Sequence, residues 1–254
     1  MIFDSHSHYD DEKFNEDRKE LLLSLNDNNV HRVVDVCAEL KSIEKVLELT
    51  REYDFIYGAI GIHPDAVGDL DESSYEYIKS SALSTDKVVA IGEIGLDYYW
   101  DNSPRDIQKK WFDRQLDIAL EINKPVIIHS RDACEDTMDL LKSRKNPLAV
   151  MHCFSYSKEI ARELLNMDFY LGIGGVVTFK NSKKLKEVVE YMPLDRMLLE
   201  TDCPYLAPAP FRGKRNDSSL LKYVVEEIAN IKNIDPLQVE EVCWNNTNTF
   251  YGLK

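Results

Sequence analysis

Paired cysteines, long apolar runs and a leader-like start are all missing from this sequence. Its five cysteines include no CxxC pair, whereas a zinc–thiolate site needs cysteines at short spacing. No stretch approaches the ~18 consecutive apolar residues of a membrane-spanning helix. The opening MIFDSHSHYDDEKF also lacks the basic and then apolar pattern of a secretory signal. These absences predict a cytoplasmic protein with reduced thiols and no membrane partner.

The sequence also lacks the short motifs of several large enzyme classes. It contains no GxSxG elbow, no Walker loop and no GxGxxG fingerprint, so acyl-serine, P-loop and dinucleotide chemistry lose support. No Gly/Ser-rich linker or low-complexity tract divides the chain. We therefore expect residues 1–254 to form a single domain, since a chain of this length can bury about 70–75% of its surface in one core.

Positive charge is in short supply. The chain has 31 Lys and Arg against 45 Asp and Glu, which gives a formal net charge of −14. Such a protein is not a general binder of nucleic acid or anionic membranes, because its long-range field repels phosphate. A phosphate-bearing substrate would need local help from a metal ion or a basic loop.

Short apolar runs alternate with longer amphipathic segments along the whole chain. Eight strands are predicted, at Ile2–His6, Arg32–Cys37, Ile56–Ile60, Val88–Ile91, Val126–His129, Ala149–His152, Tyr170–Gly174 and Met197–Glu200. Helical periodicity follows between them, for example in Ile107–Asn123, Lys183–Tyr191 and Leu220–Ile231. Eight such units predict an α/β fold of the TIM-type (β/α)8 barrel class, with a doubly wound open sheet as the alternative. A further helix near Pro236–Thr247 is expected to close the bottom or the edge of the barrel.

Histidines and carboxylates gather where the predicted strands end. The loops that follow barrel strands build the active face, so these residues are expected to converge there. Each histidine alone is more often structural, and Glu93 and Asp202 each also have a structural explanation, as a salt-bridged strand end and a loop cap. Their repetition on five strand ends favours a site. The six candidates are His6, His8, Glu93, His129, His152 and Asp202.

Six donors exceed the four ligands of one tetrahedral ion and suffice for two ions with a bridging carboxylate. Two ions about 3.5–4 Å apart can clamp the attacking and leaving oxygens of a hydrolysis and generate hydroxide near neutral pH. Mixed histidine and carboxylate ligands without thiolates suit Zn, Mg or Mn, in no order that the sequence decides.

Longer motifs surround these candidates and extend over essentially the whole chain. They are DSHSHYD (Asp4–Asp10), GIHP (Gly61–Pro64), GEIGLDYYWDNSP (Gly92–Pro104), PVIIHSRDA (Pro125–Ala133), HCFS (His152–Ser155), LLETDCPYLAP (Leu198–Pro208), RGKRN (Arg212–Asn216) and NNTNTFYGL (Asn245–Leu253). In this combination the sequence resembles the TatD family of metal-dependent deoxyribonucleases, within the amidohydrolase-like barrels. Two departures concern loops: Tyr156 replaces the usual Gly of HCFSGS, and Asp217-Ser218-Ser219 follow RGKRN without the usual Pro.

The resemblance implies a TIM-type barrel with a divalent metal centre. Carried over residue by residue, it makes the six candidates the metal ligands, with Glu93 as the bridge. It associates His63 of GIHP with binding of the scissile phosphate.

The predicted activity is hydrolysis of phosphodiester bonds of DNA, as single strands or ends, by two-metal activation of water. Glu93 and Asp202 are the predicted catalytic residues, and Asp202 is expected to accept the proton of the water. His63 with the basic Arg212, Lys214 and Arg215 would neutralise phosphate locally, and no obligate protein partner is expected. Because metals do not specify a substrate, another ester or amide such as D-aminoacyl-tRNA or a small phosphodiester is the alternative. A non-catalytic interaction module is the remaining one.

Overall fold

The structure is a computed structural model that describes all residues, 1–254. It divides into two compact units, one formed by Met1–Asp35 and Cys153–Lys254 and the other by Val36–His152. None of its helices combines the length and the apolar character needed to cross a membrane.

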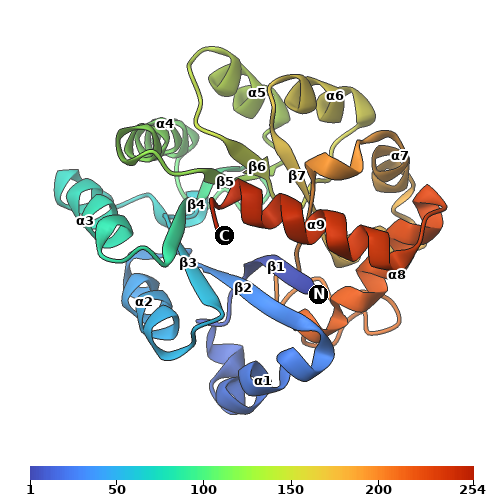
Figure 1. The fold of residues 1–254 in the computed structure, drawn as a ribbon. Helices are drawn as coiled ribbons and strands as arrows, with labels where there is room; N and C mark the ends of the chain where they lie inside the picture. Colours follow the sequence, from blue (N-terminus) through green and yellow to red (C-terminus); the bar gives the residue numbers. More distant parts are fainter. The chain divides into compact units, whose positions relative to one another are not determined.

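The second unit, Val36–His152, contains four parallel strands in chain order. They are β3 (Ile56–Ile60), β4 (Val88–Asp97), β5 (Val126–Arg131) and β6 (Ala149–Met151). Each strand but the last is followed by a helix of the unit, and a helix also precedes β3. The helices are α2 (Ile43–Glu52), α3 (Glu72–Leu83), α4 (Arg105–Ile122) and α5 (Cys134–Lys142), which lie along one side of the strands (Figure 1).

Two buried glutamines of α4 hold the strand ends that carry the candidate site. The Gln115 amide bonds both the N–H and the C=O of Ile62, at 2.7 and 3.0 Å. Gln108 does the same for Asp97, at 2.9 and 3.1 Å. Both side chains are fully buried against the sheet, so their amides replace the ladder bonds that end there.

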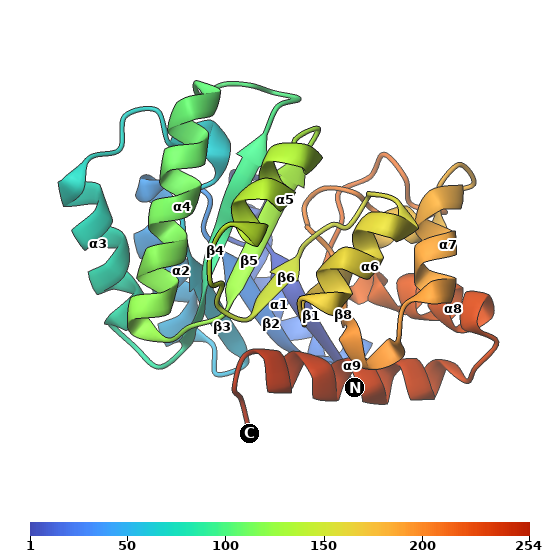
Figure 2. The same cartoon turned by 90° about the horizontal axis from the view of Figure 1, so that it is seen from above.

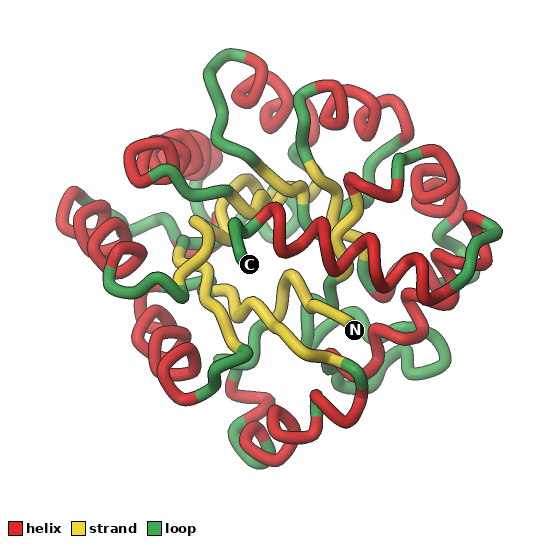
Figure 3. Tube along the Cα trace, viewed as in Figure 1, coloured by secondary structure: helices red, strands yellow, loops and turns green.

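The first unit also contains four parallel strands, in the order β7–β8–β1–β2. They are β7 (Tyr170–Ile173), β8 (Met197–Leu199), β1 (Ile2–Ser7) and β2 (Val30–Val36, all but its last residue), and a bridge from Ser7 to Cys203 joins the β8 and β1 sides. The helices of this unit are α1 (Arg18–Ser24), α6 (Lys158–Asn166), α7 (Lys183–Tyr191), α8 (Leu221–Lys232) and α9 (Pro236–Phe250), which flank the strands (Figure 3).

Helix α9 lies across the amino-terminal ends of β1 and β8 (Figure 2). The Asn246 amide donates to the carbonyls of Leu194 and Met197, both at 2.8 Å, and Trp244 packs on Phe3 with ring centroids 5.8 Å apart. This is the helix predicted near Pro236–Thr247, and it covers the strand ends opposite to those that carry His6 and Asp202.

Eight parallel strands alternating with helices confirm the predicted TIM-type (β/α)8 class, while the single domain stays a prediction. The largest difference in bounds concerns β4, which was predicted to end at Ile91 and continues to Asp97. Glu93 therefore lies within the strand and not after it. Similarly, His31 was expected before the second strand but lies within β2, with its ring 6.4 Å from that of Trp244.

Two glycines explain why the end of β4 was misjudged. A Cβ at Gly95 would lie 1.9 Å from the carbonyl oxygen of His129, and one at Gly92 would lie 2.6 Å from Ile127 Cβ. Gly95 also has φ +148°. Glycine disfavours a strand on average, but here it permits the close approach of β4 to β5 that brings their side chains together.

Candidate metal centre

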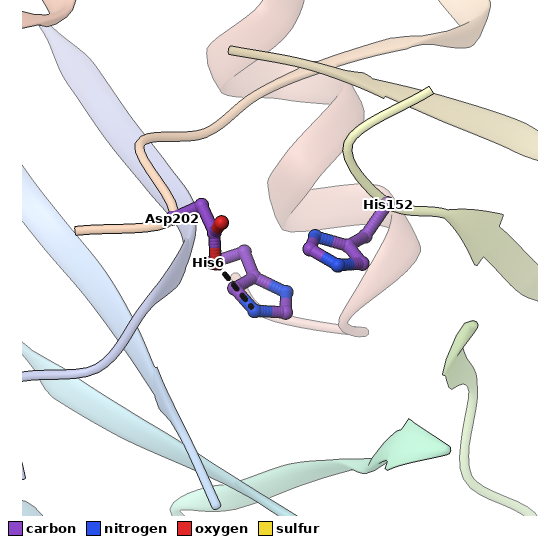
Figure 4. A group of neighbouring side chains, drawn as sticks. All are labelled: His6, His152 and Asp202. Carbon is purple, nitrogen blue, oxygen red and sulfur yellow. Dashed lines mark ion pairs between the residues drawn. The ribbon is translucent and has the colours of Figure 1, made fainter. Parts of the chain in front are cut away.

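Three predicted ligands meet in the first unit, at the carboxyl ends of β1 and β8. His6 and His8 are two residues apart along β1 and its end, so both rings project to the same side. Their Nε2 atoms are 3.1 Å apart, and Asp202 Oδ1 lies 3.3 Å from that of His8. Asp202 Oδ1 lies 3.8 Å from His6 Nε2, and Figure 4 shows this pair. Both histidines are buried, whereas the Asp202 side chain keeps 19% of its surface exposed.

A buried carboxylate fixes this first donor group. Asp4 accepts hydrogen bonds from the backbone N–H of His6 and of Thr201, at 3.2 and 3.0 Å. The hydroxyls of Thr201 and Ser218 also donate to it, both at 2.6 Å. Burial raises the pKa of Asp4 to about 6, although these hydrogen bonds lower it. Asp4 thus ties the β1 ligands to the chain just before Asp202.

Three further predicted ligands meet in the second unit. Glu93 projects from β4 and His129 from β5, while His152 follows β6. Glu93 Oε1 lies 2.7 Å from His129 Nδ1 and 2.8 Å from His152 Nε2. One ligand atom from each of the three lies within 4.8 Å of the others, and the Glu93 carboxylate is almost fully buried.

The second donor group is strongly coupled electrostatically. Burial raises the pKa of Glu93, but the imidazoles of His152 and His129 outweigh burial and hold it well below its usual range. Burial lowers the pKa of His129, but its hydrogen bonds to Asp97 and Glu93 raise it to about 9. With no ion bound the group therefore holds a carboxylate and a protonated imidazole, and a cation would replace the proton.

His63, the predicted phosphate contact, adjoins this second group. Its Nε2 lies 4.0 Å from Glu93 Oε1, and its ring centroid is 4.4 Å from that of His129. Burial lowers the pKa of His63 to about 3, so the ring is neutral. Because Nδ1 accepts the backbone N–H of Asp65 at 3.2 Å, the ring proton lies on Nε2, which is available as a donor.

Asp97 is a site residue that the sequence analysis missed. Its Oδ2 lies 2.9 Å from His129 Nε2, and its Oδ1 accepts the backbone N–H groups of Tyr99 and Trp100, both at 2.9 Å. Because Asp97 occupies Nε2, the ligand atom of His129 is Nδ1, which faces Glu93. A signal was present, because Asp97 is a second acid after Glu93 in a mostly apolar run, and a buried acid needs a partner.

The three predicted basic residues lie in the first unit, around one hollow of about 520 Å³. Its walls include Lys13, Phe179 and Tyr205 besides Arg212, Lys214 and Arg215. Arg215 is already engaged: its guanidinium makes a two-pronged ion pair with Asp17 and donates to the Lys13 carbonyl at 2.8 Å. Arg212 lies 4.5 Å over the Phe179 ring, and Lys214 is exposed. That these residues bind substrate stays a prediction.

The donor sets of both units fit a divalent cation. Each presents imidazole nitrogens and carboxylate oxygens without a thiolate, the ligand chemistry of Zn, Mn or Mg sites. In the first unit two ring nitrogens face one another beside an aspartate oxygen, an arrangement that a shared cation satisfies better than a proton does. The bridging role of Glu93 stays a prediction.

Comparisons with known proteins agree with this chemistry. The family model described as TatD related DNase matches residues 3–252. The chain is 46% identical to the uncharacterized metal-dependent hydrolase YabD of Bacillus subtilis (strain 168), over the full length of both. It is 36% identical to the uncharacterized metal-dependent hydrolase YcfH of Escherichia coli (strain K12), covering 100% of this chain and 95% of that one.

A solved structure supports the same conclusion for the fold. The crystal structure of YJJV, a TatD homolog from Escherichia coli K12, superposes with a TM-score of 0.94 at 29% sequence identity, over 100% of this chain and 98% of that one. With the family match and the conserved fold, the two donor groups make this chain a metal-dependent hydrolase that belongs to the TatD family.

Proposed function

We propose that this hydrolase cleaves phosphodiester bonds of DNA, as single strands or ends, with two divalent ions. The observation that carries the proposal is the pair of histidine–carboxylate donor groups, His6/His8/Asp202 and Glu93/His129/His152. Each group would hold one ion. The family description as TatD related DNase supports a nucleic-acid substrate.

The side chains of the chain divide the work as follows. Bound divalent ions would supply hydroxide near neutral pH and balance the negative charge that develops at phosphorus. Asp202, the part-exposed ligand, can take the proton of the attacking water. His63, neutral with its proton on Nε2, can donate a hydrogen bond to a phosphate oxygen. Asp97 keeps the His129 ring oriented.

Local cations reconcile an acidic protein with an anionic substrate. The net charge of −14 offers no general attraction to phosphate. Arg212 and Lys214 on the hollow of the first unit present positive charge on the segment that follows Asp202. We further propose that the protein works in the cytoplasm, where its five free cysteines stay reduced.

Metal removal combined with a substrate panel tests the proposal. Protein stripped by a chelator, checked by elemental analysis, should lose cleavage of a labelled single-stranded oligodeoxynucleotide, and Zn, Mg or Mn should restore it. The panel adds blunt duplex DNA, RNA of the same sequence, a D-aminoacyl-tRNA and a small phosphodiester. If the metal-loaded protein hydrolyses one of the non-DNA esters but no DNA, the proposed substrate is wrong. Full activity after exhaustive metal removal would overturn the two-metal chemistry.

A further inference from the structure

We propose that Tyr99, Trp100 and Arg131 form a stacking platform for unpaired nucleobases beside the second donor group. The inference rests on the proposed function and adds to it the residues that select unpaired bases. These three residues are called the aromatic platform below. They lie within the second unit, after β4 and at the end of β5.

The two rings of the platform face solvent to an unusual degree for large aromatic side chains. Tyr99 is 55% exposed and Trp100 is 59% exposed. Their ring centroids lie 5.0 Å apart at an interplanar angle of 88°. No other aromatic side chain of the chain is as exposed as these two, and large rings such as Trp111 are buried. Two adjacent exposed rings leave π surface available for a planar ligand.

A cation completes the platform. The Arg131 guanidinium lies 3.8 Å from the Tyr99 ring centroid and 5.8 Å from that of Trp100. Arg131 forms no ion pair with a carboxylate, whereas Arg105 at the start of α4 is paired with Asp101. Arg131 is therefore available to bind a phosphate while its guanidinium stays in contact with the Tyr99 ring.

The Asp97 side chain connects the two rings of the platform to the donor group. One oxygen of Asp97 holds the His129 ring, and the other accepts the backbone N–H groups of Tyr99 and Trp100. The Asp97 backbone is in turn clamped by the buried Gln108. Asp97 thus links the loop that carries both rings to the predicted metal ligand His129, which a simple connection from β4 to α4 would not require.

The spacing suits a nucleotide chain. His129 and Arg131 are two residues apart on β5, so their side chains project to the same side of the strand, about 6.6 Å apart along it. That distance corresponds to about two of the 3.4 Å steps of a stacked strand. A phosphodiester held at the donor group would thus place neighbouring bases over the rings.

Unpaired bases are the ligand that this combination recognises best. Exposed aromatics with a free arginine are the elements with which proteins bind single strands without sequence preference. In a duplex the base faces are already stacked, so the platform would favour single-stranded segments. A protein partner would not depend on base faces, and the following experiment separates it from nucleic acid.

The experiment compares an intact single-stranded oligodeoxynucleotide with one that carries abasic sites beside the scissile bond. For the metal-loaded enzyme, Trp100→Ala and Tyr99→Ala should raise KM for the intact strand roughly 5- to 100-fold, with kcat little changed. KM for the abasic strand should stay near the wild-type value, because it keeps the phosphates but has no bases to stack. Trp100→Phe should restore most of the affinity.

Matched variants control for surface and fold. Tyr77→Ala removes another exposed tyrosine, 44% exposed on α3, and should leave both KM values unchanged. Arg131→Gln should weaken both strands alike and reduce the salt dependence by about 0.7 of a unit of slope. Melting curves establish that each variant is folded.

The outcomes distinguish this inference from the proposed function. If DNA is cleaved but Trp100→Ala leaves KM unchanged, or weakens intact and abasic strands equally, the platform is wrong and the function stands. If no nucleic acid is cleaved, the function fails. Equilibrium binding of the same two strands then decides: a preference for the intact strand that Trp100→Ala removes supports the platform, and no such preference overturns it.

Discussion

Asp97 shows how one buried carboxylate can serve a ligand and a loop at once. Asn has the same size, but only one of its two terminal groups is an oxygen that accepts hydrogen bonds, whereas both oxygens of Asp97 accept them. If the amide NH2 faces His129 Nε2, the ring proton moves to Nδ1 and blocks the ligand atom. If the amide oxygen faces His129, the NH2 group opposes the backbone N–H groups of Tyr99 and Trp100.

Asp97→Asn should therefore weaken metal binding by about 10- to 100-fold in either orientation. Competition with a chromophoric chelator measures the affinity. Asp101→Asn is the matched control, since Asp101 lies in the same loop as Tyr99 and Trp100 and pairs with the exposed Arg105 at the start of α4. Equal affinities for the two variants would mean that Asp97 does not position the ligand.

The proton on His129 should make metal affinity depend on pH. Burial lowers its pKa, while Asp97 and Glu93 raise it to about 9. Below that value the ring is protonated in the metal-free protein, so a cation must displace a proton. Affinity should rise about tenfold per pH unit between about pH 7 and 9 and flatten above. Metal titrations across this range, with proton release followed in weak buffer, check the slope; a flat profile contradicts it.

The two predicted catalytic carboxylates should act mainly on turnover. Glu93→Ala and Asp202→Asn are each expected to lower kcat by at least about 10²-fold on DNA, because both hold metal and Asp202 also accepts a proton. His31→Ala should retain activity, since His31 lies at the amino-terminal end of β2 against Trp244. Normal turnover with full metal content in both carboxylate variants would remove them from the mechanism.

At this scale, the ligands were predictable from the sequence because they lie near or just after the ends of buried strands, as His129 and His152 do. Asp97 was not predicted, because its role depends on a hydrogen bond to His129, 32 positions away. Spacing along the chain carries no information on such a contact.

Among the elements, the segment after β8 contains both a structural arginine and cations that can bind substrate, and the sequence alone does not distinguish them. Arg215 is held by Asp17 and lies 4.8 Å over the Phe14 ring, which ties this segment to the chain before α1. Arg212 and Lys214 line the hollow without such an ion pair. RGKRN thus contains one structural arginine and two cations that can meet phosphate.

The double variant Arg212→Ala/Lys214→Ala should raise KM for an oligonucleotide and flatten its salt dependence by up to ~1.4 units of slope, since each lost contact removes about 0.7. A small phosphodiester, which lacks flanking phosphates, should be nearly unaffected. Arg215→Ala should instead lower the melting temperature. If the double variant loses metal, or if long and short substrates suffer alike, the hollow supports the site and does not bind phosphate.

The strands were predictable as elements and less so at their ends. β3 has the bounds that its apolar run predicted, whereas β4 extends six residues further than expected. The predicted strand Val88–Ile91 ended with its apolar run, just before Gly92. β4 continues to Asp97 because the β5 backbone approaches Gly95 closely, and this contact joins segments about 30 residues apart in the sequence.

For the molecule as a whole, the alternation of strands and helices was sufficient to predict the fold class. The periodicity records which residues are buried, and burial sets the layers of an α/β fold. The metal should contribute to the stability of this fold, because its ligands come together only in the folded chain.

Saturation with the active metal should raise the melting temperature. At 100 times the dissociation constant the gain is about 2.7 kcal/mol, which corresponds to roughly 5–10 °C for a chain of this size. Thermal unfolding with and without metal measures it, and Glu93→Ala should show a smaller rise. An equal rise in that variant would indicate binding elsewhere.

Helix α9 brings the two ends of the chain to the same region of the first unit. The Met1 ammonium pairs with Glu240 at 2.8 Å, and Arg32 donates to the carbonyl of Lys254 at 3.1 Å. Both termini thus lie beside the amino-terminal strand ends, whereas His6 and Asp202 lie at the carboxyl ends. A surface tether or a fused reporter at either terminus would leave the first donor group facing solution, and a short linker joining the termini would allow circular permutation.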